Sequence, residues 1–432
     1  MSLPRYAEYR ECGVQWLGSI PANWKPTPLK YLADFVNGYV FKPGTWSESG
    51  TPIIRIENLN GSNNFNFYDG ELDERNHVAK GDLLFGWSGN RGTSFGPVIW
   101  KRAGHYFLNQ HIFKIAGTRC DVGWLYWCLK AVTTHVEDQA TGIIGMVHVT
   151  KGDLGAIKVP VPSAEEQTAI ATFLDRETGK IDALIAEQEK LLTLLAEKRQ
   201  ATISHAVTRG LNPDAPMKDS GVAWLGEVPV HWNVVCLRRI ARNVETGGTP
   251  SSESPSGDLE DGLPWYTPGD FGAELVLCDS QKRVALSLVD SGEVKAFPPG
   301  SILIVSIGAT LGKVGLSGSL ASANQQINAV LLNTSMDELF VAYSLSVKSE
   351  VMRFLSNAST IGIMNQSKTK EIQVAVPPQV EQVSVASYLD EATARVDLLE
   401  VEASRAITLL KERRSALIAA AVTGKIDVRQ AV

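Results

Sequence analysis

The chain has 432 residues, of which 44% are hydrophobic and 20% are charged, and its formal net charge is -6 at pH 7. These values are typical of a globular protein with two or three domains and exclude a disordered or fibrous chain. The net charge is +2 for residues 1–160, -2 for 161–210, -5 for 211–376 and -1 for 377–432. No segment is a polycation, so tight binding to a polyanion would require local basic patches or a partner's basic surface.

The five cysteines are odd in number and form no CxxC pair, so the sequence indicates neither a disulfide framework nor a zinc site. The first residues lack the apolar stretch of a signal peptide. No run of about 18 apolar residues is present that could span a bilayer. The sequence therefore predicts a cytoplasmic protein with no membrane partner.

The first third of the chain mixes strands and helices. Strand character is present at residues 51–59, 80–87 and 96–100, which are rich in β-branched, leucine and aromatic residues. Residues 121–130 are predicted to form a short helix that begins near an aspartate. This alternation predicts a mixed α/β domain.

A long helix is predicted next, because apolar residues recur at alternating spacings of three and four from Ile170 onward. The predicted apolar seam of this helix continues through Leu174, Ile181, Leu184, Leu191 and Leu195. Only Glu177 and Gln188 interrupt it. Residues 210–221, which are rich in proline, glycine and aspartate, are predicted to be the linker between the two halves.

The second half repeats this order. Strands are predicted at residues 300–307 and 327–332, and a short helix at 336–347. A second long helix carries a seam in the same phase: Val385, Leu389, Ala392, Val396, Leu399, Ala403, Ala406 and Leu410. The two seams predict a coiled coil in which the small alanines allow close approach. The alternative is two independent amphipathic helices, each lying on its own domain.

Two stretches of sequence recur at nearly constant offsets. Residues 14–33 match residues 222–241 at an offset of 208, with two tryptophans, a glycine and a proline at the same spacing. Residues 159–185 match residues 374–400 at an offset of 215, and the match continues further along both long helices. Such self-similarity fixes the architecture before any local prediction is made.

The repeat and the periodicity together predict a mixed α/β (α+β) fold. Two similar domains are separated by two long antiparallel coiled-coil helices and are related by a pseudo-twofold axis. The predicted divisions are a first domain at 1–160, a first spacer helix at 161–210, a second domain at 211–376, and a second spacer helix with a C-terminal tail at 377–432.

The sequence contains no recognisable catalytic motif. The segment GATLGKVG at 308–315 differs from a phosphate loop, because only three residues separate its glycines and Val314 follows Lys313. A glycine-rich turn between two strands is predicted there instead. NPDA at 212–215 is not a methyltransferase tetrapeptide of the NPPY type, and the seven histidines show no metal-ligand spacing. We therefore expect no catalytic residue, no metal site and no cofactor.

The paired WLG…(I/V)P…W openings, the P-x-x-E-Q entry to each long helix and the L-D that follows resemble the specificity subunits of type I restriction-modification systems. The P-x-x-E-Q pattern is exact at Pro378–Gln382 and has one extra residue at Pro162–Gln167, and the ANQQIN segment at 323–328 agrees as well. The likeness covers essentially the whole chain.

The resemblance implies a non-catalytic subunit in which each domain is a target-recognition domain that reads one half of a bipartite site in double-stranded DNA. It also implies that the helices separate the two domains and dock two adenine-methyltransferase subunits, which ATP-dependent restriction subunits then join. S-adenosylmethionine, ATP and magnesium would belong to these partners.

DNA contacts are expected in polar loops that follow strands, because Arg and Lys bond guanine and Asn and Gln bond adenine in the major groove. The predicted DNA-binding residues of the first domain are Ser88, Asn90, Arg91, His148 and Lys151. Those of the second domain are Thr310, Lys313, Asn365, Gln366, Ser367 and Lys368. For each residue the alternative is a turn residue that bonds its own backbone. Four amides at matched places are predicted to brace the fold: Asn109, Gln110, Asn324 and Gln325.

Two other functions remain open from the sequence. One is a coiled-coil adaptor that organises partner proteins without reading DNA. The other, a single-chain nuclease or methyltransferase, is disfavoured because the motifs of both enzymes are missing.

Overall fold

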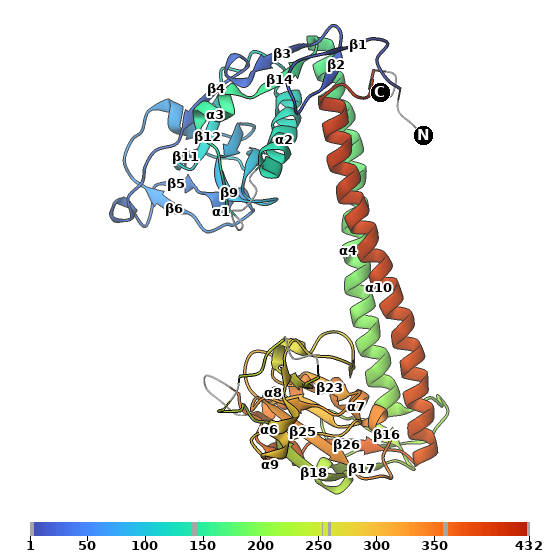
Figure 1. The fold of residues 1–432 in the computed structure, drawn as a ribbon. Helices are drawn as coiled ribbons and strands as arrows, with labels where there is room; N and C mark the ends of the chain where they lie inside the picture. The colour runs from blue at the N-terminus through green and yellow to red at the C-terminus, as the bar shows by residue number, and fades with distance from the viewer. Residues whose placement is uncertain (1–3, 140–145, 253, 258–260, 357–361, 430–432) are drawn as a thin grey trace. The chain divides into compact units, whose positions relative to one another are not determined.

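The computed structural model describes residues 4–139, 146–252, 254–257, 261–356 and 362–429 (Figure 1). The chain divides into two compact units, Met1–Glu189 with Ser404–Val432, and Lys190–Ala403. Each unit contains one α/β domain and part of both long helices, α4 (Ala164–Arg209) and α10 (Gln379–Val422). Among the residues just given, no helix combines the length and the apolar composition that a bilayer crossing requires.

The domain of the first unit is built on a four-stranded antiparallel sheet in the order β10-β8-β12-β4. Its strands are β4 (Asp34–Asn37), β8 (Leu83–Gly86), β10 (Gly96–Ile99) and β12 (Ile112–Ala116). Helix α2 (Val122–Gln139) packs against β10, and its Trp124 is buried in the core with Phe85 and Phe113. The predicted strands near 80–87 and 96–100 are therefore confirmed, and so is the start of the helix predicted at 121–130, which continues to Gln139.

A second sheet of this domain has the order β6-β5-β11-β7, with β5 and β11 parallel. Its strands are β5 (Thr51–Ile54), β6 (Asn66–Tyr68), β7 (His77–Val78) and β11 (Tyr106–Leu108). The strand predicted over 51–59 is wrong beyond Ile54, because α1 (Ile56–Leu59) follows. The Asn58 side chain accepts from the backbone N–H of Arg55 at 2.8 Å, which turns the chain into a short helix.

The second unit has the same strand order in its main sheet, β18-β25-β22-β23, extended by β20. The five strands are β18 (Ala241–Thr246), β20 (Val276–Leu277), β22 (Ile302–Val305), β23 (Val314–Ser317) and β25 (Ile327–Leu332). Helix α7 (Glu338–Ser346) packs on β23. The sequence at 308–315 forms the predicted glycine-rich turn between β22 and β23.

Smaller elements complete both units. In the first they are β1 (Tyr9–Glu11), β2 (Ser19–Pro21), β3 (Lys25–Pro28), β9 (Ser88–Asn90), β13 (Met146–His148), α3 (Lys151–Ala156) and β14 (Lys158–Val161). In the second they are β15 (Met217–Asp219), β16 (Glu227–Pro229), β17 (Asn233–Cys236), α5 (Leu237–Ile240), β19 (Leu263–Tyr266), β21 (Arg283–Val284), α6 (Leu286–Asp290), β24 (Ser322–Ala323), α8 (Ser349–Ser356), α9 (Gln366–Lys370) and β26 (Gln373–Val376). The predicted linker thus ends in a strand, because β15 pairs with β16.

The repeated sequence motifs build the junction between each domain and the long helix that follows it. Trp24 Nε1 donates to Glu166 Oε1 at 3.3 Å in the first unit. In the second unit Trp232 Nε1 donates to Glu381 Oε1 at 3.1 Å. Both indoles are fully buried, and a buried N–H needs an acceptor. The second tryptophan of the WLG…P…W opening and the glutamate of the P-x-x-E-Q entry are therefore hydrogen-bonded to each other in both units.

The glutamine of the same entry motif joins three segments. Gln167 accepts from the backbone N–H of Asp121 at the start of α2 and donates to the carbonyl of Pro162. Gln382 makes the equivalent pair of bonds, with Asp337 at the start of α7 and with Pro377. The same side-chain geometry in both units confirms the internal repeat at the level of single hydrogen bonds.

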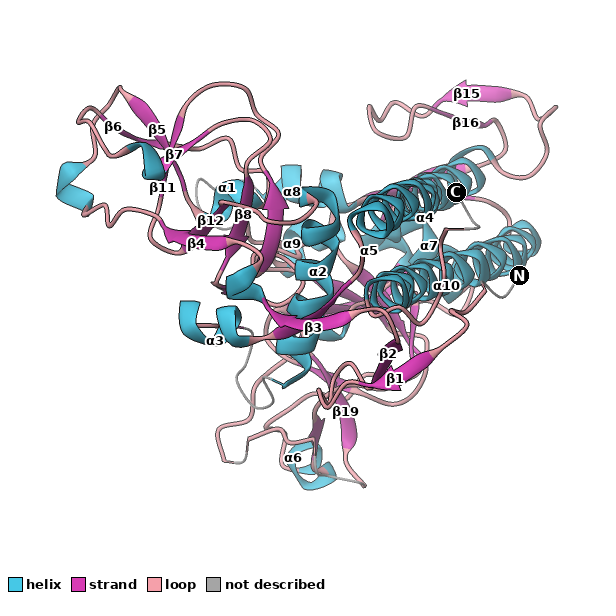
Figure 2. Cartoon of the chain, turned by 90° about the horizontal axis from the view of Figure 1, so that it is seen from above, coloured by secondary structure: helices cyan, strands magenta, loops and turns pink. Residues whose placement is uncertain are grey.

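The helices α4 and α10 run antiparallel, and Figures 1 and 2 both show them alongside each other. In the first unit Arg414 of α10 pairs with Asp182 of α4 at 2.8 Å. In the second unit Arg199 of α4 pairs with Asp397 of α10. Each residue of one pair lies 215 positions from its counterpart in the other, which is the offset of the sequence repeat. The predicted fold class, with two domains and paired antiparallel helices, is confirmed.

The predicted seam is wrong at three leucines. Leu184, Leu191 and Leu399 are 52%, 38% and 51% exposed. In α4 the half-buried positions between Ile181 and Leu195 are instead Ile185, Gln188 and Leu192. Leu184 and Leu191 each precede an apolar neighbour in the chain, and one residue rotates a side chain by about 100° around a helix. The sequence therefore contains two adjacent apolar rows along α4. The structure buries the row with Ile185 and Leu192 and leaves the predicted row with Leu184 and Leu191 exposed.

Candidate nucleic-acid interface

The structure brings together most of the predicted residues of the first domain. Ser88 and Asn90 lie in β9 rather than in a loop, and β9 pairs with β13 so that Ser88 is opposite His148. The His148 ring packs edge-on against Trp87, with 4.7 Å between ring centroids. Lys151 follows three residues later, at the start of α3, where the side chain of the preceding threonine caps the helix.

Arg91 lies at the tip between β9 and β10 and is exposed. Its guanidinium donates to the carbonyl of Glu137 near the end of α2, and the Glu137 carboxylate accepts from the backbone N–H of Gly92 at 2.9 Å. These bonds hold the tip against α2 in this structure. A role for Arg91 in DNA contact stays a prediction.

The predicted residues of the second domain make mainly internal contacts. Lys313 donates to the carbonyl of Phe271 at 2.6 Å from the turn that it shares with Thr310. Lys368 donates to the carbonyl of Ser356 at 2.7 Å. Asn365 is the N-cap of α9, and its side chain accepts from the backbone N–H of Lys368. This bond agrees with the alternative interpretation of Asn365, a residue that bonds its own local backbone.

The two other residues of this cluster differ in exposure. Gln366 contacts Thr246 at the end of β18 and is half-buried. Ser367 is exposed on α9. The two sets of predicted residues occupy equivalent positions. In the first domain the segment after β8 pairs with the segment that leads into α3. In the second domain the segment after β22 pairs with the segment that leads into α9.

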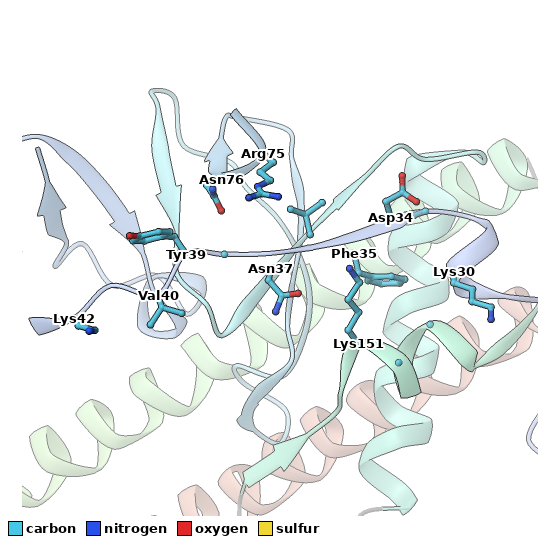
Figure 3. A pocket seen from close by; sticks show the side chains of 15 residues that line it. Lys30, Asp34, Phe35, Asn37, Tyr39, Val40, Lys42, Arg75, Asn76 and Lys151 are labelled. Atoms are coloured by element: carbon cyan, nitrogen blue, oxygen red, sulfur yellow. The ribbon is translucent and has the colours of Figure 1, made fainter. Parts of the chain in front are cut away.

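A groove of about 1190 Å³ runs beside β4 in the first unit (Figure 3). Four cations line it: Lys30, Lys42, Arg75 and Lys151. Asp34 is the one acid in its lining, and this carboxylate is already paired with Arg119 at 3.2 Å. Arg75 also pairs with Asp73 at 3.7 Å, so Lys30, Lys42 and Lys151 give the groove its net positive charge, as a surface that binds phosphate groups requires.

The same groove also carries amides and an aromatic side chain. Figure 3 shows Asn37 and Lys151 on one side of the β4 backbone, and Arg75 with Asn76 on the other. Tyr39 is 42% exposed at one end. Its ring contacts other aromatic rings of the domain, which hold it in place. The groove thus combines cations, which can bind phosphates, with groups that can contact base edges.

The turn at the end of β4 depends on a close approach between two backbones. A Cβ added at Gly38 would lie 2.1 Å from the carbonyl oxygen of Asn109, and one at Gly247 in the second unit would lie 2.2 Å from that of Ala323. The Asn109 and Asn324 side chains accept from backbone N–H groups two residues further on. These two asparagines therefore brace the fold, as predicted.

Sequence reasoning found only Lys151 among the cations of the groove. It missed Lys30, Lys42, Arg75 and Tyr39, which come from three separate stretches of the first 80 residues. A weak signal was present, because the segment GYVFKPG, which contains two aromatic residues and a lysine, directly follows β4. No periodicity connects that segment to residue 75 or to residue 151.

The second domain presents different chemistry at the equivalent place. Ile307 forms a β-bridge with Ile363 where the first domain has Ser88 opposite His148. A smaller cavity of about 360 Å³ lies beside this turn, with Arg353 and Phe354 in its lining. Phe354 is 76% exposed and Ile363 is 48% exposed. The two domains therefore share a fold but offer unlike surfaces.

The model of the family described as the type I restriction modification DNA specificity domain matches residues 21–193 and 229–408. The chain belongs to this family. Each match begins in the opening motif of one copy and continues into a long helix. The two copies found in the sequence and in the structure are thus two specificity domains.

Relatives resemble the chain over nearly its full length. The specificity subunit of the type I restriction enzyme EcoBI from Escherichia coli is 22% identical and covers 98% of this chain, which spans 90% of that protein. The putative specificity subunit of the type I restriction enzyme MjaX from Methanocaldococcus jannaschii is also 22% identical, and the match covers 96% of both chains.

Two solved structures share the fold. A chain from a study of complex assembly and conformational transition in the type I R-M system has a TM-score of 0.65 at 16% identity, covering 93% of this chain and 98% of that one. The HsdS subunit from Thermoanaerobacter tengcongensis has a TM-score of 0.50 at 16% identity, covering 94% and 98%. At this level of identity the likeness concerns the fold.

Proposed function

We propose that the chain is the sequence-specific DNA-recognition subunit of a type I restriction-modification complex. Each domain reads one half of a bipartite target in double-stranded DNA. The helices α4 and α10 dock adenine-methyltransferase subunits, two in number, and ATP-dependent restriction subunits join this core. The observation that carries the proposal is the duplication of the specificity domain, with unlike surfaces at equivalent places in the two copies.

The internal symmetry suits this task. Each copy carries its own domain and its own share of both long helices, so one chain offers two separate reading domains to one duplex. An adenine must leave the base stack to be methylated, and the reader holds the DNA while its partner flips the base. The chain itself is non-catalytic and cytoplasmic in this proposal, and the partners bind S-adenosylmethionine, ATP and magnesium.

The groove beside β4 is the proposed DNA contact of the first domain. Its four cations bind backbone phosphates, which fixes the register of the domain on the duplex. Asn37 and Tyr39 lie between these cations and are placed to contact base edges. The predicted contacts at Ser88, His148 and the second-domain turn extend the reading surface.

Exchange of one domain tests the proposal. Residues 1–160 are replaced by the equivalent block of a relative with a different target, and modified adenines are mapped by sequencing in cells that carry the complete system. We expect one half-site to change and the other to stay. A change in both half-sites, or in neither, contradicts modular reading.

A second experiment separates the reader from an adaptor that only organises partners. The purified chain is combined with its methyltransferase subunits, and binding to target DNA is measured by gel shift. Assembly of the complex without retardation of the DNA would favour the adaptor.

A further inference from the structure

A second cavity in the first unit lies apart from the groove beside β4. Its volume is about 650 Å³, and its walls come from β10, α2, α4 and α10. A neighbouring cavity of about 450 Å³ lies between α2 and α10. Lys130 and Arg414 line both cavities, so these two cations stand at the wall between them.

Lys130 carries a charge that the protein does not neutralise directly. Its ammonium lies 5.6 Å from the centre of the Tyr126 ring, and no carboxylate of the described chain lies within 4 Å of it. Burial, and then the charge of Arg414, lowers the pKa of Lys130, while the Glu137 carboxylate acts in the opposite direction. A partly buried cation is unfavourable unless an anion approaches it.

The rest of the lining leaves the cavity positive. It contains the cations Lys101, Arg102, Lys130 and Arg414 against two acids, Asp175 and Asp182. Both acids are already engaged: Asp175 accepts from Trp127 Nε1 at 2.9 Å, and Asp182 pairs with Arg414. Trp100, also in the lining and only 3% exposed, has an indole N–H without an acceptor. Arg102 donates to the carbonyls of Gly61 and Ser62, which leaves Lys101, Lys130 and the Trp100 indole as the donors in excess.

A glycine in the interior of α4 is a further observation that suggests a ligand in this cavity. Gly179 lines the cavity in the interior of a long helix, where glycine is unfavourable relative to alanine. Packing does not require it, because an added Cβ would meet no atom within 4 Å. The residue 215 positions later in the second copy is Ala394. The missing side chain of Gly179 thus leaves room in the cavity and has no other structural reason.

At the equivalent place in the second unit, the polar side chains bond to other groups of the protein. Arg199, the counterpart of Arg414, pairs with Asp397 and also donates to the carbonyl of Ala273 at 3.1 Å. The position of Lys130 is taken by Ser346, whose hydroxyl donates to the carbonyl of Tyr343 within α7. The excess of donors is therefore a feature of the first unit.

We propose that this cavity of the first unit binds a phosphate group. A phosphate offers several charged acceptor oxygens to guanidinium, ammonium and indole donors, and such charge-assisted bonds are strong. The cavity lies within the range of roughly 300 to 1,000 Å³ that is common for small-molecule sites. The phosphate belongs either to the DNA backbone, in which case the inference rests on the proposed function, or to a free phosphate ester.

The first experiment uses the full-length chain alone in a buffer without phosphate. Inorganic phosphate is titrated and its binding is followed by calorimetry. Lys130→Met removes the charge and keeps the stem, and Gly179→Leu fills the space while favouring the helix. We expect each variant to bind phosphate at least about tenfold more weakly, the effect of one charged hydrogen bond, with a thermal midpoint no lower than that of the wild type.

Matched controls come from the second unit. Lys348→Met removes another buried lysine, and Ala394→Leu makes the equivalent helix substitution. Both should leave phosphate binding unchanged. Wild-type phosphate binding that persists undiminished in Lys130→Met and Gly179→Leu would overturn the proposal.

The second experiment distinguishes the two sources of phosphate. DNA binding by the chain with its methyltransferase subunits is measured at several salt concentrations. If the phosphate belongs to DNA, Lys130→Met makes the slope of log K against log salt shallower by about 0.9. If the chain binds phosphate in the first experiment but Lys130→Met leaves the salt slope of DNA binding unchanged, the site is assigned to a free phosphate ester. No phosphate binding and an unchanged slope overturn the proposal, whereas a complex that binds no DNA contradicts only the proposed function.

Discussion

Replacing Lys348 by methionine should stabilise the second unit at neutral pH. Lys348 is 4% exposed between α7 and α8, and burial alone lowers its pKa from 10.5 to about 8. Methionine keeps an unbranched apolar side chain of similar length, so the packing changes little. The variant therefore removes the cost of a buried ammonium without opening a cavity.

The magnitude follows from the change in pKa. Each pKa unit corresponds to about 1.36 kcal/mol, so a fall from 10.5 to about 8 corresponds to about 3 kcal/mol at pH 7. The folded state loses the proton as the pH rises through about 8, whereas the unfolded state keeps it until about 10.5. The cost is thus complete below pH 8 and vanishes toward pH 10.5. At pH 9.5 the advantage of Lys348→Met should shrink to about 1 kcal/mol.

Hydrogen exchange measures this effect within the second unit. Peptides that cover α7 and α8 are compared between wild type and Lys348→Met at pH 7 and at pH 9.5, each variant against wild type at the same pH. Lys282→Met, which replaces an exposed lysine of the same unit, should change nothing at either pH. Equal protection in Lys348→Met and wild type at pH 7, or the same gain at both pH values, would refute the reasoning.

Three further predictions concern DNA. Lys151→Ala should weaken DNA binding by the assembled complex uniformly across sequences and reduce the salt slope by about 0.9, which gel shifts at several salt concentrations would reveal. Arg91→Ala or Lys313→Ala should cost about 1 to 3 kcal/mol and relax specificity at one position, as binding to single-base variants of the target would show; no loss would mean that their bonds to backbone carbonyls are their whole role. Inserting one heptad into each long helix, after Lys190 and after Arg405, should lengthen both helices by about 10 Å and widen the preferred gap by about three base pairs. Mapped adenines with an unchanged gap would show that the helices do not set it.

The architecture was predictable because it depends on repeated patterns. The offset between Trp24 and Trp232 located the two domains, and the period of the apolar residues located α4 and α10. The exact seam was not predictable, since α4 has adjacent apolar residues at 184 and 185 and only the partner helix decides which is buried. The period of the apolar residues predicts that two helices pack together more reliably than it predicts which apolar residues lie in the contact.

The candidate site was predictable only in part, because tertiary structure assembles it. Lys151 was found from its place after a strand, but Arg75 enters the groove from the 3-10 turn before β7 and Lys30 from the one before β4. Residues predicted as loop contacts also have structural roles that the sequence does not reveal, such as the cap that Asn365 makes for α9. Side-chain type alone does not separate a reader from a turn residue.

Different residues build the fold and the proposed reading surface of this chain. The residues that match between the copies, such as Trp24 with Trp232 and Glu166 with Glu381, bond to each other inside their own unit. Lys30 of the groove has a cationic counterpart in Arg238, but the place of Lys151 is taken by Gln366 in the second copy. A substitution of Lys151 therefore leaves the buried contacts of both units intact. Because the buried contacts and the proposed reading surface use different side chains, we expect that either domain can change its target without a new fold.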